Sequence, residues 1–171
     1  MITLNILRHA KSSWDDASAR DFDRPLNARG RQAAERMGRE LKQRRIGFDR
    51  VLASPAVRVR QTIDRVADGY GALPEFNFDD SIYEAGERFL IAMVRALPAD
   101  LHAPLIVGHN PGLHSLVMAL TSDDEQGLRA KIAAKFPTAA FAAIEFPSRK
   151  WSEVEPGSGL LRVVIVPREL D

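Results

Sequence analysis

The chain has 171 residues, of which 45% are hydrophobic and 27% are charged, with no cysteine and a formal net charge of +1. This composition predicts one globular domain over residues 1–171, and it excludes disulfide bonds, thiolate zinc sites and a cysteine nucleophile. No apolar run approaches the roughly 18 to 20 residues that span a bilayer, and the N-terminus resembles no export signal, so we expect a cytoplasmic protein without a membrane partner.

The first 53 residues alternate apolar runs with polar or amphipathic segments. Residues 2–7 are mostly apolar and predict a buried strand, whereas the polar segment 11–26 predicts a loop. Asn27 can cap a helix whose apolar residues follow at helical spacing, and we expect Gly47 to end that helix. A second strand is predicted over residues 50–53.

A second helix is expected after Ser54 and Pro55. Val59, Ile63 and Val66 are spaced so that they fall on one face of a helix, which predicts a buried stripe. Gly69 and Gly71 are expected to stop this helix.

The second half continues the alternation of strand and helix. Its predicted elements are helices over 87–97 and 113–120, strands over 104–107, 141–146 and 160–166, a loop or short strand at 82–84, and a turn at 155–159. This order favours an α/β fold, a three-layer α/β/α sandwich with a largely parallel central sheet.

Charge is unevenly distributed along the chain. Residues 1–70 hold 15 of the 24 Lys and Arg residues but only 9 of the 23 Asp and Glu residues. The N-terminal part is therefore the more favourable place for an anion. Seven of these basic residues fall in the first predicted helical segment, where a solvated, salt-bridged face accounts for much of the excess.

Three predicted strands are followed by polar residues suited to binding a phosphate. Arg8 and His9 follow the first strand, Ser54 leads to Arg58 after the second, and His109 follows the third. Ligands of open α/β sheets bind at the carboxyl ends of the strands, so neighbouring strands would bring these groups together. Two guanidiniums can hold phosphoryl oxygens through paired hydrogen bonds, and the start of the helix that carries Arg58 can add backbone donors.

Such a pocket supports chemistry that needs no metal. A neutral imidazole can attack phosphorus and carry the phosphoryl group as a phosphohistidine. Nearby arginines disfavour the imidazolium, which keeps the attacking nitrogen unprotonated, and a second histidine can donate to the phosphoryl oxygens.

These motifs resemble those of a known family. The three motifs each follow a predicted strand. Their residues and their order along the chain are similar to the signatures of the histidine phosphatase superfamily, which has the phosphoglycerate mutase-like fold. Two further stretches are similar to its small phosphohistidine phosphatase (SixA-type) branch. The superfamily motifs are Arg8-His9-Ala10, Ser54-Pro55-x-x-Arg58-x-x-Gln61-Thr62 and Gly108-His109-Asn110-Pro111, and the SixA-type stretches are Asp21-x-x-Arg24-Pro25-Leu26 and Phe136-Pro137-Thr138-Ala139-Ala140.

The resemblance implies a role for each matching residue. His9 is the expected nucleophile, Arg8 and Arg58 the phosphate-binding residues, and His109 the second imidazole. It implies neither a metal nor an organic cofactor. Ala10 departs from the usual glycine, which we expect to narrow the space beside the phosphate.

The proton donor is less well defined by the sequence. Glu84 lies where mutase-type relatives place an acidic residue, and it is the first candidate for the general acid. Asp15, Asp16 and Asp21 are alternatives in the loop before the first helix. A phosphohistidine substrate relaxes the requirement, because its leaving nitrogen can take a proton from water.

The sequence is compatible with several functions. The preferred one is a metal-independent phosphatase that hydrolyses phosphohistidine in a protein. The alternatives are a non-catalytic module that binds a phosphoprotein, and a phosphatase of a small phosphorylated metabolite. Asp21-Phe22-Asp23 superficially matches the motif of magnesium-dependent aspartyl phosphatases, but no apolar strand precedes it. Nucleic-acid binding has only the basic N-terminal part in its favour, so no nucleic-acid partner is expected.

Overall fold

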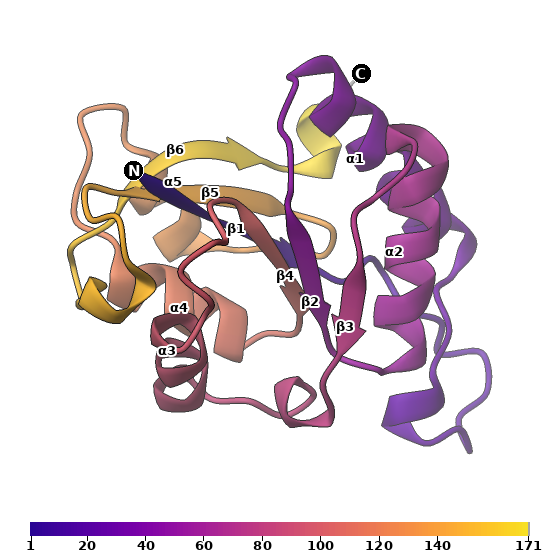
Figure 1. The fold of residues 1–171 in the computed structure, drawn as a ribbon. Helices are drawn as coiled ribbons and strands as arrows, with labels where there is room; N and C mark the ends of the chain where they lie inside the picture. The colour runs from indigo at the N-terminus through magenta and orange to yellow at the C-terminus, as the bar shows by residue number, and fades with distance from the viewer. Residues whose placement is uncertain (171) are drawn as a thin grey trace.

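A six-stranded sheet with helices on both faces forms the framework of the protein (Figure 1). The computed structural model describes residues 1–170. The strand order is β3-β2-β4-β1-β5-β6, so β1 and β4, which precede the two histidine motifs, are neighbours. The strands are β1 (Ile2–Arg8), β2 (Arg50–Ala53), β3 (Phe76–Phe78), β4 (Pro104–Gly108), β5 (Phe141–Phe146) and β6 (Leu160–Ile165).

The direction of the strands confirms a largely parallel sheet. β3, β2, β4 and β1 run parallel, whereas β5 is antiparallel to both of its neighbours, β1 and β6. The register pairs Arg8 with Gly108 and Ala53 with Val107. The carboxyl ends of β1, β2 and β4 therefore lie side by side at one edge of the sheet, where ligands of such sheets bind.

Helices cover the sheet in two layers (Figure 1). Helices α1 (Ala28–Gln43) and α2 (Val57–Tyr70) pack on one face, and α3 (Glu87–Arg95), α4 (Gly112–Leu120) and α5 (Leu128–Ala134) pack on the other. This arrangement confirms the predicted α/β/α sandwich.

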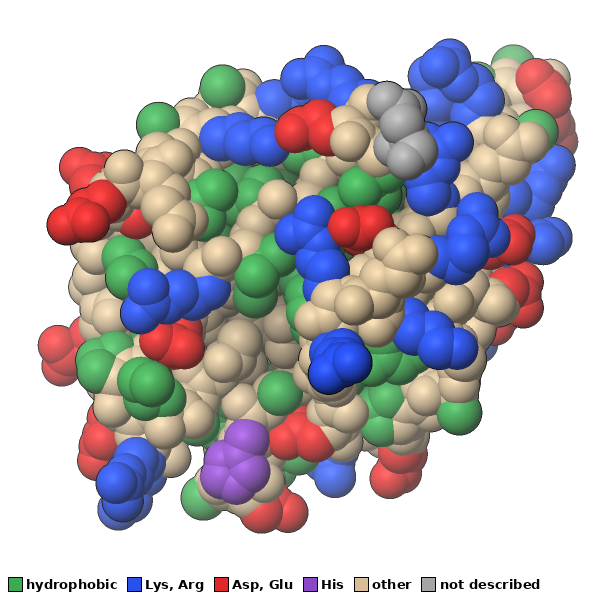
Figure 2. Space-filling view, turned by 90° about the horizontal axis from the view of Figure 1, so that it is seen from above, with side chains coloured by type: hydrophobic (Ala, Val, Ile, Leu, Met, Phe, Trp, Pro, Cys, Tyr) green, Lys and Arg blue, Asp and Glu red, His purple; other side chains and the backbone are tan. Residues whose placement is uncertain are grey.

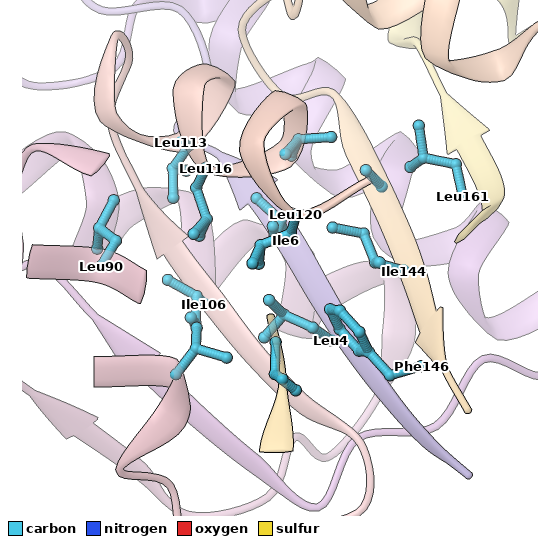
Figure 3. Close-up of a cluster of buried hydrophobic side chains, with 14 of the residues drawn as sticks. Leu4, Ile6, Leu90, Ile106, Leu113, Leu116, Leu120, Ile144, Phe146 and Leu161 are labelled. Atoms are coloured by element: carbon cyan, nitrogen blue, oxygen red, sulfur yellow. The ribbon is translucent and has the colours of Figure 1, made fainter. Parts of the chain in front are cut away.

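Alternate strand residues supply the two hydrophobic clusters between these layers. Ile106 packs with the cluster that includes Leu90 and Leu116, which Figure 3 shows, while its neighbour Val107 belongs to the cluster on the side of α1 and α2. This follows from the period of two in a strand. Each buried Leu or Ile contributes about 1.5–3 kcal/mol, so both clusters hold the strand ends of the site in fixed positions.

Helix α1 begins as predicted and ends earlier than predicted. The side chain of Asn27 accepts a hydrogen bond from a backbone N–H in the first turn. The predicted end at Gly47 is wrong, because Arg45 adopts a left-handed conformation with φ of 58°. This turns the chain so that the N–H of Ile46 donates to the carbonyl of Leu41 and satisfies it.

Two elements that the sequence did not predict are short. β3 is an edge strand whose residues Phe76–Phe78 are all exposed, so it has no alternation of apolar and polar residues. Helix α5 has seven residues, too few for a clear helical period. Of the loop and the short strand expected at 82–84, the structure agrees with the loop: residue 82 ends a 3-10 helix, η2 (Asp80–Ile82), and residues 83–84 form a turn. The other 3-10 helices are η1 (Asp21–Asp23), η3 (Trp151–Glu153) and η4 (Pro167–Glu169).

The end of α2 follows the prediction in part. Gly71 terminates the helix with φ of 103°, whereas Gly69 lies inside it.

The surface of the molecule carries both signs of charge. On the face seen in Figure 2, basic and acidic side chains lie interspersed, so this face has no broad field of one sign. Within residues 1–170, no helix has the length and the apolar character needed to cross a membrane.

Candidate active site

Two histidines and two arginines meet beyond the carboxyl ends of the central strands. His9 follows β1, which ends at Arg8, and His109 follows the neighbouring strand β4. The ring centroids of the two histidines lie 5.3 Å apart. Arg58 projects from the first turn of α2, and its Nη2 lies 3.2 Å from Nδ1 of His109. The structure thus brings together the four side chains that the sequence singled out.

His9 is buried, with only 7% of its surface exposed. Its Nδ1 lies 2.7 Å from the carbonyl oxygen of Ala10, so Nδ1 carries the proton and Nε2 keeps a free lone pair. Burial lowers the pKa of His9 to about 4, and the charges of Arg58 and Arg8 act in the same direction. The imidazole is therefore neutral at neutral pH.

His109 is held as the opposite tautomer. Its Nδ1 accepts a hydrogen bond from Arg58, because a guanidinium can only donate, and its Nε2–H donates to Oγ of Ser54 at 2.8 Å. Burial, followed by the charges of Arg58 and of His9, lowers the pKa of His109 to about 3. The edge-on ring of Tyr83, 5.3 Å away between centroids, covers another side of the imidazole.

The side chain of Arg8 contacts the segment that precedes β5. Its Nη1 donates to the carbonyl of Phe136 at 3.2 Å, and its Nε is buried without a hydrogen-bond partner. Burial, followed by the charge of Arg58, lowers the pKa of this guanidinium. A half-buried guanidinium with one unpartnered N–H, beside a second cation, favours an incoming anion.

Arg58 is occupied by the loop that precedes α1. Its Nη1 donates to the carbonyl of Asp21 at 2.7 Å, and its Nη2 donates to the carboxylate of Asp21 at 3.0 Å. The hydroxyl of Tyr83 donates to the same carboxylate. The bond from Tyr83 and those from Arg58 lower the pKa of Asp21, so this residue is ionised at neutral pH. Asp21 therefore accepts hydrogen bonds from Arg58, the guanidinium that the resemblance to the histidine phosphatases assigns to phosphate binding.

A cavity of about 320 Å³ opens beside these groups. Glu84, the candidate general acid, is exposed and lines this cavity together with Asp21, Arg58 and His109. Of the alternative acids, Asp21 reaches the site, but Asp15 and Asp16 are absent from the described lining, and Asp16 binds Ser18 instead. Two carboxylates, Glu84 and Asp21, thus line the same cavity as His109, whereas His9 and Arg8 are absent from the described lining.

Ala10 fits its position without backbone strain. Its methyl group is fully buried in the hydrophobic cluster on the α1 and α2 side, which also contains Leu26 and Val59. The backbone N–H of Ala10 donates to Oγ1 of Thr62 at 2.9 Å. This bond joins the segment after β1 to helix α2.

The rest of the loop before α1 is held by Arg24. This guanidinium donates to the carbonyl of Asp16 at 3.2 Å and lies 3.8 Å from the ring centroid of Trp14. Arg24 therefore stabilises the loop.

Among residues 1–170, no three His, Asp or Glu side chains are grouped so that they could hold a metal ion.

Sequence reasoning gave no role to Ser54, Thr62 or Tyr83. Ser54 and Thr62 belong to the motif around Arg58, which was the available signal for them. Tyr83 carries no such signal, because its contact with Asp21 joins residues far apart in the sequence.

Comparisons with known proteins agree with this arrangement. A model of the histidine phosphatase superfamily (branch 1) matches residues 4–87. An uncharacterised protein of Mycobacterium tuberculosis is 33% identical over 164 residues, which are 95% of this chain and 100% of the relative. The phosphohistidine phosphatase SixA of Escherichia coli is 28% identical over 141 residues, 81% of this chain and 82% of that protein.

A solved structure gives the same result for the fold. The protein of Agrobacterium tumefaciens assigned as phosphohistidine phosphatase SixA has a TM-score of 0.81 and 27% identity, with 97% of this chain and 98% of that chain covered. The chain belongs to the histidine phosphatase superfamily, in its SixA-like branch, and is a phosphatase.

Proposed function

We propose that this phosphatase works without a metal, through a phosphohistidine on His9, and that its substrate is phosphohistidine in a protein. The observation that carries the proposal is the hydrogen bond from Nδ1 of His9 to the carbonyl of Ala10. It leaves Nε2 as the free nitrogen, and a pKa of about 4 keeps that nitrogen unprotonated at neutral pH.

In the first step, the lone pair of Nε2 forms a bond to phosphorus while the bond from phosphorus to the leaving atom breaks. The leaving atom takes the electron pair of that bond. Arg8 and Arg58 hold the non-bridging oxygens, and Arg58 exchanges Asp21 for the phosphoryl group. A bound dianion favours protonation of His109 at Nδ1, which can then donate to a phosphoryl oxygen.

In the second step, water attacks phosphorus, the bond from phosphorus to Nε2 of His9 breaks, and its electron pair returns to the imidazole. Glu84, on the cavity wall, accepts a proton from this water. In the first step, the same residue protonates the leaving group when the leaving atom is an oxygen. A leaving imidazole of a phosphohistidine substrate takes its proton from water, so this substrate depends less on Glu84.

The charges of the site support a reaction without a metal. Two guanidiniums supply positive charge at the phosphoryl oxygens, which is the contribution that a metal ion makes in metal-dependent phosphatases. Activity measured in excess EDTA should equal activity without it. Loss of activity in EDTA that added magnesium restores would contradict this part of the proposal.

Two observations support a phosphorylated protein as the partner. The relative from Escherichia coli is named for phosphohistidine. The cavity is walled on one side by exposed residues, Glu84 and Gly86, which leaves access for a phosphate that stands on a protein surface. A cytoplasmic location for this reaction remains a prediction of the sequence.

The test uses a peptide with one phosphohistidine and, separately, p-nitrophenyl phosphate. We expect release of phosphate from both, with a larger kcat/KM for the peptide. Rapid quenching should trap a phosphorylated enzyme whose adduct is labile in acid and stable in base. His9→Ala should abolish the adduct and turnover, while His102→Ala, a change at an exposed histidine outside the site, should preserve both.

Other outcomes would identify the alternatives. Binding of the peptide without adduct or turnover would mean a phosphoprotein-binding module. Rapid hydrolysis of a small phosphorylated metabolite, with no hydrolysis of the peptide, would mean a metabolite phosphatase. An adduct that persists in His9→Ala would place the nucleophile on another residue.

A further inference from the structure

A second cavity, of about 330 Å³, lies between the start of α1, the segment 135–138 and the residues after β6. It is strongly basic. Among the described residues that line it there is no Asp or Glu. Its basic side chains are Lys11, Arg29, Arg36, Lys135 and Arg168, all of them exposed.

These five cations have no carboxylate partner within residues 1–170. The hydrogen bond of Arg36 runs to the backbone carbonyl of Leu170. Elsewhere on the same helix, Arg39 pairs with Glu35 and Arg44 pairs with Glu40. Cations without a carboxylate partner among the described residues repel one another around one cavity, and an anionic ligand relieves that repulsion.

The basic cavity adjoins the catalytic segment through the backbone. Lys11 lies two residues after His9, so their Cα atoms are at most about 7 Å apart. On the other side of the cavity, the N–H of Ala139 donates to the carbonyl of His9 at 2.9 Å. Helix α1 packs directly on this segment, because a Cβ on Gly30 would lie 2.1 Å from the carbonyl oxygen of Lys11.

We propose that the basic cavity binds an acidic segment of the phosphorylated protein substrate while the phosphohistidine occupies the site at His9. This inference rests on the proposed function, since it names how that substrate is recognised. The five cations come from separate stretches of chain around an open surface. Such a layout suits carboxylates spread along a peptide better than one compact anion.

Two synthetic phosphohistidine peptides test the proposal. One carries a tail of six glutamates after a short spacer, and the other carries a tail of six glutamines. At low ionic strength, wild-type enzyme should hydrolyse the glutamate-tailed peptide with about tenfold higher kcat/KM, mainly through a lower KM. The preference should shrink as salt is added, because the interacting charges are exposed.

Charge reversal locates the effect. The double variant Arg29→Glu/Lys135→Glu should lose the preference while its kcat/KM for p-nitrophenyl phosphate stays within about twofold of wild type. Lys42→Glu/Lys150→Glu reverses two exposed lysines outside the basic cavity, is therefore matched in net charge, and should keep the preference. Wild-type enzyme without a preference, or a double variant that retains it, would overturn the proposal.

Direct binding separates this proposal from the catalytic one. Fluorescence anisotropy with the unphosphorylated glutamate-tailed peptide should show binding to wild type and to His9→Ala, and none to Arg29→Glu/Lys135→Glu. This result would support the docking cavity even for a protein that hydrolyses no phosphate. Tight binding of inorganic tripolyphosphate with no binding of the peptide would instead mean a site for small polyanions, and the proposal would be wrong.

Discussion

At the scale of single residues, the pKa of His9 reflects its neighbours. Burial makes the largest contribution to the value of about 4, and Arg58 lowers the pKa further through its charge. Removing that charge in Arg58→Gln should therefore raise the pKa of His9. A titration of the imidazole signals by NMR measures this shift directly, without any need for activity.

The neighbouring Arg60 provides the control for this titration. It lies on the same helix, is exposed and donates to the carbonyl of Pro55. Arg60→Gln should leave the pKa of His9 at its wild-type value. An unchanged value in Arg58→Gln would mean that burial alone sets the pKa of the nucleophile.

Asp21 competes with phosphate for Arg58. Its carboxylate accepts hydrogen bonds from Arg58 and Tyr83, and both lower its pKa, so a phosphate dianion meets a like charge at the site. Asp21→Asn removes that charge, and we expect orthovanadate to bind several-fold more tightly. Inhibition constants against p-nitrophenyl phosphate measure this change.

A matched variant tests whether the location of the charge matters. Asp23 lies in the same 3-10 helix but pairs with Arg20, away from Arg58. Asp23→Asn should therefore leave the inhibition constant of orthovanadate unchanged. Weaker binding of vanadate in Asp21→Asn would instead mean that Asp21 holds Arg58 in the orientation that receives the anion.

Local motifs made part of the site predictable. His9 and Arg58 stand in runs of residues whose types fit phosphate chemistry and whose order places them after strands. The contact between Tyr83 and Asp21 joins two loops, and neither loop has a period that fixes its path. Side-chain pairs across irregular segments therefore required the structure.

At the scale of elements, a close contact positions the segment that carries Glu84. A Cβ on Gly112, at the start of α4, would lie 2.2 Å from the carbonyl oxygen of Ala85. Gly112→Ala must therefore displace the backbone next to Glu84. We expect a loss of about 1–3 kcal/mol in the free energy of unfolding and a lower kcat for p-nitrophenyl phosphate.

The adjacent loop offers a matched control for this substitution. A Cβ on Gly86 would meet no atom within 4 Å, so Gly86→Ala should be close to wild type in urea unfolding. If Gly112→Ala lowers stability as expected and leaves kcat unchanged, the position of Glu84 is not important for an oxygen leaving group.

The elements that were predicted correctly have a clear period or a buried apolar run. Helix α2 has such a stripe, and β4 is buried at every residue. The end of α1 was mispredicted because a non-glycine residue, Arg45, takes the left-handed position where glycine is expected. β3 was missed because its pairing with β2, a long-range contact, makes it a strand.

At the scale of the whole molecule, strand order brings the motifs together. The alternation of elements predicted a parallel sheet but left the order of its strands open. In the sheet, β4 lies between β1 and β2, so the residues that follow all three strands meet. Only long-range pairing in the core determines that order.

Folding keeps His9, which is buried, and His109, which is half-buried, neutral, and this links stability to pH. The pKa is about 4 for His9 and about 3 for His109, against an ordinary value of 6.5 in the unfolded chain. Between these values the unfolded chain binds more protons than the native protein. The free energy of unfolding should therefore have its full value above pH 6.5. It should decrease as the pH drops toward 4, by up to about 1.4 kcal/mol per pH unit for each histidine.

Urea unfolding at a series of pH values between 7.5 and about 4.5 measures this loss. His9→Gln and His109→Gln each remove one of the two groups. In each variant, the slope of the free energy of unfolding against pH should fall to about half of the wild-type slope below pH 6.5 and should equal the wild-type slope above pH 7. Comparing slopes within each variant cancels any constant loss of stability from the substitution itself. If both variants keep the full wild-type slope, other groups cause the acid sensitivity, and the two imidazoles are not held neutral by the fold.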